Sequence, residues 1–222
     1  MSSENKANGL TTENELKNGR EFIRICASLK TVSVACHSDA DGLTSGLLAA
    51  RTLERLGVPS VPIIPTGKGE NVHQDPMREK IRRIAPQALI VTDMGSRADP
   101  IVPGLPTLII DHHHPHGFPP GAVTVSAFGH EPIVSSSLLA WHLCAPLVSL
   151  DDLKWLGLLG VVGDLGTAFP FPDWTPLLKV YGGRHVTEAV ALLNAAYRHP
   201  LGAHAEKVYR ARRKRYVSSE PS

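Results

Sequence analysis

Two short apolar segments of the chain each end in an aspartate, and the second continues directly into three histidines. "ALIVTD" ends at Asp93, and "TLIIDHHH" carries Asp111 followed by His112, His113 and His114. Short, continuous apolar runs rich in β-branched residues predict strands that are buried on both faces, as in parallel sheets. Acids and imidazoles at the ends of buried strands are costly to desolvate unless a metal, a ligand or water offsets the cost. The two segments therefore predict a buried sheet with a polar edge.

Helical patterns separate these apolar runs along most of the sequence. Strands are predicted over residues 31–36, 59–65, 87–93, 106–111 and 121–126, and helices over 13–29, 43–57, 76–85, 135–147, 151–164 and 186–198. Strands that alternate with amphipathic helices form a mainly parallel sheet with helices on both faces. The expected fold is thus an open α/β domain with about five strands. In such sheets ligands bind outside the carboxyl ends of the strands.

Composition limits the class of protein and its compartment. The 222 residues suffice for one α/β domain with a short appendage. The cysteines Cys26, Cys36 and Cys144 lack CxxC spacing, so neither a zinc knuckle nor a disulfide framework is predicted, and a reducing compartment is expected. The polar N-terminus is unlike a signal peptide, and no apolar run approaches membrane-spanning length. A cytoplasmic protein without a membrane partner is expected.

The chain is predicted to consist of three parts, of which the last is strongly basic. Residues 1–29 form a polar lead with a short helix, residues 30–200 a catalytic domain, and residues 201–222 a basic helix or linker. The last part contains six cations at Lys207, Arg210, Arg212, Arg213, Lys214 and Arg215. Because the net charge of the chain is +2, the remainder sums to 2 − 6 = −4. A solvated helix and a track for nucleic-acid phosphates are both consistent with this tail.

Four polar clusters fall at the predicted polar edge. "HSDADG" places His37, Asp39 and Asp41 at alternate positions, so that in an extended segment they project to one side. Asp93 and the "DHHH" segment end the third and fourth strands, and "GVVGDLG" places Asp164 at the glycine-rich end of an apolar helix. These clusters are expected to meet, because the carboxyl ends of parallel strands share one edge.

Each cluster alone has an ordinary explanation as a turn, a helix cap or a solvated loop. A solvated loop is the interpretation kept for His116 and His130. Together, four carboxylates would repel one another without a counter-charge, and two divalent cations would balance Asp39, Asp41, Asp93 and Asp164. Mixed oxygen and imidazole ligands favour manganese, with magnesium, cobalt and zinc as alternatives. A centre with two divalent cations is therefore predicted.

"HSDADG", "TD", "DHH" and "GVVGD", in this order, resemble the four motifs of the DHH phosphoesterases. The similarity spans roughly residues 30–198 and is greatest to the catalytic domain of RecJ-like single-strand-specific exonucleases. It implies that one cation binds His37, Asp39 and Asp93. It implies that the other binds Asp41, Asp93, His112 and Asp164. His113 would face the scissile phosphate and Asp111 would orient the histidines, whereas His114 lies outside the motif and receives no role.

This resemblance implies a metal-dependent phosphodiesterase that hydrolyses single-stranded DNA or short oligonucleotides by a two-metal mechanism. Hydrolysis of a small nucleotide or a pyrophosphate-like compound on the same centre is an alternative. The pyrophosphatases of this superfamily have wider spacing in the first motif, so "HSDADG" favours the nuclease branch. A non-catalytic interaction module for nucleic acid or replication proteins is a third hypothesis.

The chain departs from RecJ-like enzymes after the catalytic domain. Those enzymes carry a second, smaller domain with a glycine-rich motif that ends in histidine, and only "YGGRH" superficially resembles it. A protein partner that supplies this domain is one expectation. Arg184 in "YGGRH" and the loop residues Lys68 and His73 are candidates for substrate contacts, with a turn and a solvated loop as the alternatives.

Overall fold

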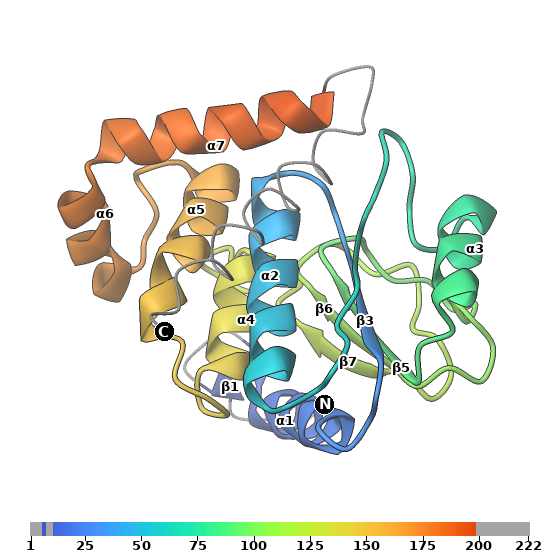
Figure 1. Cartoon of the computed structure of the whole chain (residues 1–222). Helices are drawn as coiled ribbons and strands as arrows, with labels where there is room; N and C mark the ends of the chain where they lie inside the picture. The colour runs from blue at the N-terminus through green and yellow to red at the C-terminus, as the bar shows by residue number, and fades with distance from the viewer. Residues whose placement is uncertain (1–5, 8–10, 199–222) are drawn as a thin grey trace, which may run out of the picture.

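A five-stranded parallel sheet lies at the centre of the structure, a computed structural model that describes residues 6–7 and 11–198 (Figure 1). Its strands are β3 (Val32–Cys36), β4 (Ile63–Pro65), β5 (Ala88–Thr92), β6 (Thr107–Asp111) and β7 (Val123–Ser126). They follow the order β4-β3-β5-β6-β7, and every neighbouring pair is parallel. The predicted open parallel sheet is confirmed. The basic segment 201–222 lies outside the described residues.

Both faces of the sheet are buried. Successive side chains of a strand point to opposite sides, and the apolar side chains on each side belong to an apolar cluster. Val34 and Ile90 belong to a large apolar cluster on one face, whereas Leu89 and Val91 belong to a smaller cluster on the other. Helix α3 (Asp75–Ile84) covers the smaller cluster with Met77 and Ile81. The predicted helices on both faces are confirmed.

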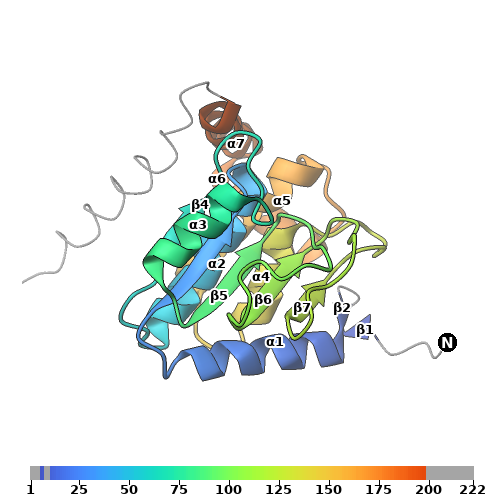
Figure 2. The same ribbon diagram turned by 90° about the vertical axis from the view of Figure 1, so that its right-hand side faces the viewer.

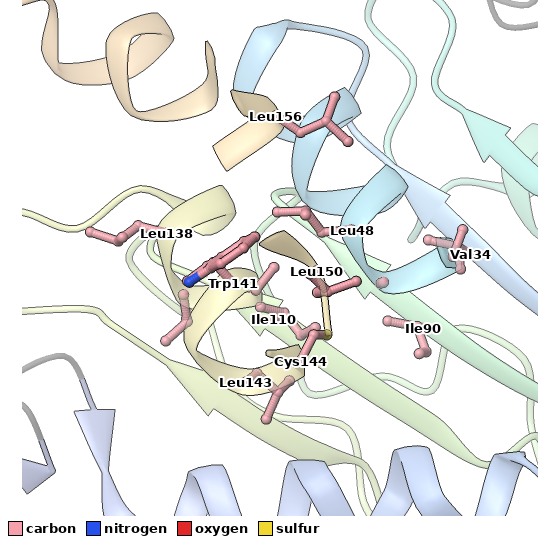
Figure 3. Close-up of a cluster of buried hydrophobic side chains, with 14 of the residues drawn as sticks. Val34, Leu48, Ile90, Ile110, Leu138, Trp141, Leu143, Cys144, Leu150 and Leu156 are labelled. Atoms are coloured by element: carbon pink, nitrogen blue, oxygen red, sulfur yellow. The ribbon is translucent and has the colours of Figure 1, made fainter. Parts of the chain in front are cut away.

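Three of the helices that contribute to the larger cluster are α2 (Ala40–Arg55), α4 (Ser136–Cys144) and α5 (Lys154–Leu165). Leu48 of α2 and Leu138 of α4 lie with Ile110 of the sheet in this cluster (Figure 3). Each such side chain is buried, which contributes roughly 1.5–3 kcal/mol per residue. Helices α2 and α4 pack directly on the sheet, and α5 packs on α2 and α4.

Helix α1 (Glu13–Cys26) runs under the sheet beside β7 (Figure 2). Its first residue follows a capping box, in which the side chain of Thr12 accepts a hydrogen bond from Glu15 N and the Glu15 carboxylate accepts one from Thr12 N. Two short antiparallel strands, β1 (Lys6–Ala7) and β2 (Thr11–Thr12), precede it. None of the helices in the described ranges is long and apolar enough to cross a bilayer.

The start of α2 corrects the geometry expected for the first polar cluster. The helix begins at Ala40 instead of Leu43, and Asp39 is its N-cap residue. The carboxylate of Asp39 accepts a hydrogen bond from Gly42 N at 2.9 Å, which satisfies one of the free N–H groups of the first turn. The prediction that Asp41 lies in an extended segment is therefore wrong, because the capping aspartate starts the helix before it.

The last described helix lies over the carboxyl edge of the sheet (Figure 1). Short 3₁₀ segments at Asp151–Leu153 and Pro172–Trp174 precede α5 and α6 (Thr175–Tyr181), and α7 (Gly183–Arg198) follows. Gly182 has φ +77° and separates α6 from α7, so the turn predicted at the two glycines uses only the first. Helix α7 packs on α5 and contacts α2 (Figure 1).

Candidate metal centre

The polar clusters meet at the point where the order of the strands reverses. From β3 the chain passes to β4 on one side and then to β5 on the other side of β3. Crevices for ligands open outside the carboxyl ends of strands at such a switch point. His37 follows β3 and Asp93 follows β5, so these residues flank the crevice.

Asp93 occupies the centre of the cluster in an uncommon backbone conformation. Its φ of 64° lies in the left-handed region, which asparagine and aspartate tolerate better than other non-glycine residues. Its side chain is only 2% exposed. Desolvation by burial, reinforced by the nearby carboxylates of Asp41 and Asp39, raises the pKa of Asp93 well above its usual value. Both the backbone and the charge of this residue are therefore held in an unfavourable state by the surrounding fold.

His37 and Asp39 approach Asp93 from the first motif. His37 Nδ1 lies 2.9 Å from Asp39 Oδ2 and 3.7 Å from Asp93 Oδ2. A glycine at position 42 permits this approach, because a Cβ atom there would lie 2.4 Å from the Cβ of His37. Burial alone would raise the pKa of Asp39, but the hydrogen bond from His37 lowers it. These donors form a group on the β3 side of the crevice.

His112 and Asp164 form the opposite side. His112 Nε2 lies 3.4 Å from Asp93 Oδ1 and 3.3 Å from Asp164 Oδ2. Burial, together with the charge of Asp41, raises the pKa of Asp164 to about 7. Asp164 reaches this position because Gly163 allows α5 to approach α2, where a Cβ atom would lie 2.9 Å from the Cβ of Ala40.

The buried carboxylate of Asp41 is held by the first turn of α4. Its two oxygens accept hydrogen bonds from Ser136 N at 2.7 Å and from Ser137 N at 2.9 Å. The hydroxyl of Ser136 donates to Asp93 Oδ1 at 2.9 Å. Free N–H groups at a helix N-terminus favour a negative charge, so α4 stabilises this part of the cluster. These serines lie at the start of a predicted helix, but their contacts with both aspartates were not anticipated from the sequence.

Asp111 orients His113 at the mouth of the crevice. His113 Nδ1 lies 2.9 Å from Asp111 Oδ1, and His113 N donates to the same oxygen at 2.7 Å. Asp111 Oδ2 accepts hydrogen bonds from Met94 N and Gly95 N. The hydrogen bond to Asp111 raises the pKa of His113. Burial alone would raise the pKa of Asp111, but the hydrogen bond from His113 lowers it. The side chain of His113 is 52% exposed, so its ring is available to a ligand.

Nitrogen and oxygen donors converge in three groups, within each of which the atoms lie within 4.8 Å of one another. The groups are His37, Asp39 and Asp93; Asp93, His112 and His113; and Asp41, His112 and Asp164. Asp93 belongs to two groups, and so does His112. Burial raises the pKa of Asp93 and of Asp164. Carboxylate oxygens that face imidazole nitrogens in this way suit divalent cations of the first transition row. The residues present therefore fit a metal centre.

A cavity of about 470 Å³ adjoins the cluster. His37, Asp39, Asp93 and His113 form its inner wall. Its outer wall includes Asn71, Ser96, Arg97, His114 and His116. Within the described part of the chain, the exposed guanidinium of Arg97 makes no ion pair with a carboxylate. Sequence reasoning missed Arg97, although "MGSR" directly follows the end of a predicted strand and could have indicated it.

The residues predicted to contact substrate lie apart from this cavity. Arg184 is in the first turn of α7, 88% exposed, and its Nε lies 2.9 Å from Glu188 Oε1. About 20 Å along the helix axis separates Arg184 from the last turn of α7. Lys68 is exposed on its loop, and His73 is buried with Nδ1 at 3.8 Å from Asp99 Oδ1. Neither of these two lines the cavity.

The last turns of α7 touch the first motif, which sequence reasoning did not anticipate. Asn194 Oδ1 accepts a hydrogen bond from Ala40 N at 2.9 Å, and so satisfies the first N–H of α2. The hydroxyl of Tyr197 lies 3.3 Å from His37 Nε2, on the side of the ring opposite the carboxylates. Helical periodicity predicted α7 but carried no signal for where it would dock.

A family model described as "DHH family, N-terminal domain" matches residues 31–158. No curated protein sequence matches the chain at a significant level.

Solved structures with 14–22% sequence identity share the fold. An exonuclease RecJ bound to manganese is 22% identical with a TM-score of 0.62, and the match covers 87% of this chain and 59% of that one. RecJ with manganese from Thermus thermophilus is 18% identical with a TM-score of 0.56, over 92% and 39% of the two chains. The DHH domain of a member of a ribosomal-protein family is 14% identical with a TM-score of 0.61, over 85% and 54%. The chain thus spans about two fifths to three fifths of these structures.

Proposed function

Because the chain belongs to the DHH family of phosphoesterases, we propose that it is a metal-dependent phosphodiesterase acting on single-stranded DNA or short oligonucleotides. The observation that carries the proposal is the convergence of three donor groups around Asp93 at the switch point of the sheet. A buried aspartate in a left-handed conformation, surrounded by further carboxylates, is costly in the absence of a cation. A metal centre accounts for that cost.

We assign two divalent cations to the cluster, with manganese preferred and magnesium or cobalt as alternatives. One would be held by His37, Asp39 and Asp93, and the other by Asp41, Asp93, His112 and Asp164. Bound there, such ions would supply Lewis-acid activation of water and would neutralise charge on phosphoryl oxygens. Asp93 would serve both sites, since its oxygens lie near donors on each side of the crevice.

His113 is the proposed acid of the reaction. Its Nδ1 is occupied by Asp111, which leaves Nε2 free for a substrate oxygen. Because the hydrogen bond from His113 to Asp111 raises the pKa of the ring, the imidazolium form persists to higher pH than in an isolated histidine. That form can stabilise charge on the phosphoryl group or donate a proton to the leaving oxygen. Asp111 is then a positioning residue for His113.

Hydrolysis of a small nucleotide is the second candidate. The cavity beside the cluster, about 470 Å³, lies in the range of pockets that enclose small molecules. The same donor set would serve either substrate, so the distinction depends on what the outer wall of the cavity binds. Nucleic-acid or protein partners belong to this proposal as well.

Turnover with manganese separates these functions. A labelled single-stranded oligonucleotide, a dinucleotide, a mononucleotide and pyrophosphate are incubated with the protein, with and without a chelator. The proposal predicts chelator-sensitive hydrolysis of the oligonucleotide and the dinucleotide, and loss of hydrolysis in the His113→Ala variant. Hydrolysis of pyrophosphate alone would overturn the nuclease assignment. Binding of single strands without turnover of any substrate would instead support a non-catalytic module.

A further inference from the structure

Three aromatic rings lie next to one another beside the metal-binding cluster, and two of them line the cavity. The ring centroids of His114 and Phe128 are 4.7 Å apart in an edge-to-face arrangement, and those of His114 and His116 are 5.4 Å apart. His114 and His116 line the same cavity as the metal-binding cluster. Phe128 is 48% exposed, so a large apolar ring faces solvent at this point. The proposed phosphodiester chemistry gives none of the three a role.

The sheet fixes these rings next to the metal-binding cluster. Ser126, the last residue of β7, pairs with Asp111, and Ala127 N donates to Asp111 O at 2.9 Å. Phe128 therefore follows the sheet edge immediately beside the strand that leads into the histidine segment. On the other side, His116 N donates to Ser96 O at 2.8 Å, which ties the histidine segment to the loop that follows Asp93.

Packing does not explain the exposed ring. A single exposed apolar residue is ordinary on a protein surface. Here, however, the ring contacts a histidine that itself lines the cavity, and the histidine ring is exposed too. Bases of single strands stack on such rings, and aromatic contacts of this kind tolerate any base because every base has a π-face.

We propose that His114, His116 and Phe128 form a stacking site for one nucleobase of the substrate, adjacent to the phosphate at the metal centre. The inference rests on the proposed function and narrows it, because a substrate that carries a base gains a contact that pyrophosphate lacks. Phe128 supplies the apolar face, and the two imidazoles connect that face to the cavity. The third histidine, outside the family motif, thereby acquires a function in substrate selection.

Kinetics on three matched substrates test the site. They are a deoxyadenosine dinucleotide and two analogues, in each of which one of the two bases is replaced by hydrogen. For the parent protein, kcat/KM on the intact dinucleotide should exceed that on one of the analogues by about tenfold. Phe128→Ala should lower kcat/KM on the intact dinucleotide by a similar factor and leave that analogue within about twofold. An equal loss on both substrates would overturn the inference.

Matched variants separate stacking from other effects. Phe128→Trp and His114→Phe retain an aromatic surface and should keep the preference for the intact dinucleotide, whereas His114→Ala should reduce it. Tyr181, an aromatic residue on α6 that is 45% exposed and does not line the cavity, provides the control. Tyr181→Ala should behave like the parent on both substrates. Loss of the preference in the Tyr181 variant would contradict the assigned location.

A binding measurement distinguishes failure of this inference from failure of the proposed function. With the metal removed by a chelator, a dinucleotide containing 2-aminopurine reports stacking through quenching of its fluorescence. Quenching by the parent but not by Phe128→Ala supports the stacking site even if no substrate is hydrolysed. Hydrolysis by the parent with unchanged quenching and unchanged base preference in Phe128→Ala would retain the function and reject the site.

Discussion

The metal-binding cluster has a buried half and an open half, and the two are built differently. Asp41, Asp93 and Asp111 are almost fully buried, and each carboxylate accepts hydrogen bonds from a fixed backbone N–H or from the hydroxyl of Ser136. His37 and His113 are partly exposed at the cavity. The buried carboxylates are thus placed before any ligand arrives, whereas the imidazoles lie at the opening, where His113 is positioned by Asp111.

The difference indicates a division of work. Buried like charges raise the cost of the metal-free state and therefore drive cation binding. Exposed imidazoles contribute less electrostatic strain, and they adjoin the space in which a substrate would lie. Changes in the buried half should accordingly affect metal content and stability, while changes in the open half should affect rates and substrate preference.

Removing the shared aspartate should have the largest effect. Asp93→Ala deletes a donor from both sides of the crevice and should lose more metal than His37→Ala, with activity lower than the parent by at least about 10³-fold. Metal analysis of purified variants and assays at fixed manganese provide the measurements. A metal content in Asp93→Ala equal to that of the parent would show that the buried half of the cluster does not control metal binding.

The contribution of Asp164 to the stability of the metal-free protein should fall as pH rises from about 4 to about 7. Asp164 has a folded pKa of about 7, above the ordinary value near 4 that it has when unfolded. Between these values the folded state binds more protons than the unfolded state, so its advantage diminishes with increasing pH, by roughly 2–4 kcal/mol. Thermal unfolding in the presence of a chelator measures this.

Two comparisons make the pH prediction specific. Asp164→Asn removes the titrating group, so its metal-free form should show a smaller decrease over the same pH range. Manganese should abolish the decrease in the parent, because cations replace the protons between the carboxylates. The same pH dependence in the metal-free parent and in Asp164→Asn would show that the pKa of Asp164 is not raised in the folded protein.

Loss of the serine hydroxyl next to Asp93 should have an intermediate effect. Ser136→Ala removes the hydrogen bond that orients one oxygen of Asp93 and should weaken manganese binding by about tenfold. Ser137→Ala is the matched control, since its hydroxyl contacts Gly157 O and its backbone still holds Asp41. Titration of metal into both variants checks this, and equal weakening in the two would assign the effect to general loss of packing.

The smallest effect is expected at the opening of the cluster. Tyr197→Phe removes the hydroxyl that lies 3.3 Å from His37 Nε2 but retains the ring. A change of about two- to threefold in manganese affinity is expected, and Tyr197→Ala should exceed it because the ring contact is also lost. A tenfold loss of manganese affinity in Tyr197→Phe would show that Tyr197 supports metal binding as strongly as Ser136.

The sequence predicted the sheet and the edge at which the cluster lies, because apolar runs and their terminal acids are local signals. Asp93, Asp111 and His112 could be placed from their strands alone. Contacts between distant segments could not, since periodicity identifies a helix but not its neighbour. The hydrogen bond from Ser136 N to Asp41 spans 95 residues, and the contact of Tyr197 with His37 spans 160. Asp41 was predicted to join the cluster from an extended segment. It joins the cluster from the first turn of α2 instead, because Asp39 caps that helix.

The left-handed backbone at Asp93 restricts which amino acids position 93 can accept. Glycine, asparagine and aspartate adopt this conformation at little cost, and of these only aspartate carries a carboxylate. Glutamate keeps the charge but not the backbone, and asparagine keeps the backbone but not the charge. The backbone conformation and the need for a carboxylate, taken together, thus allow only aspartate at this position. Within this family fold, a chain with asparagine at the equivalent site would be expected to retain the shape of the crevice after its chemistry has been lost.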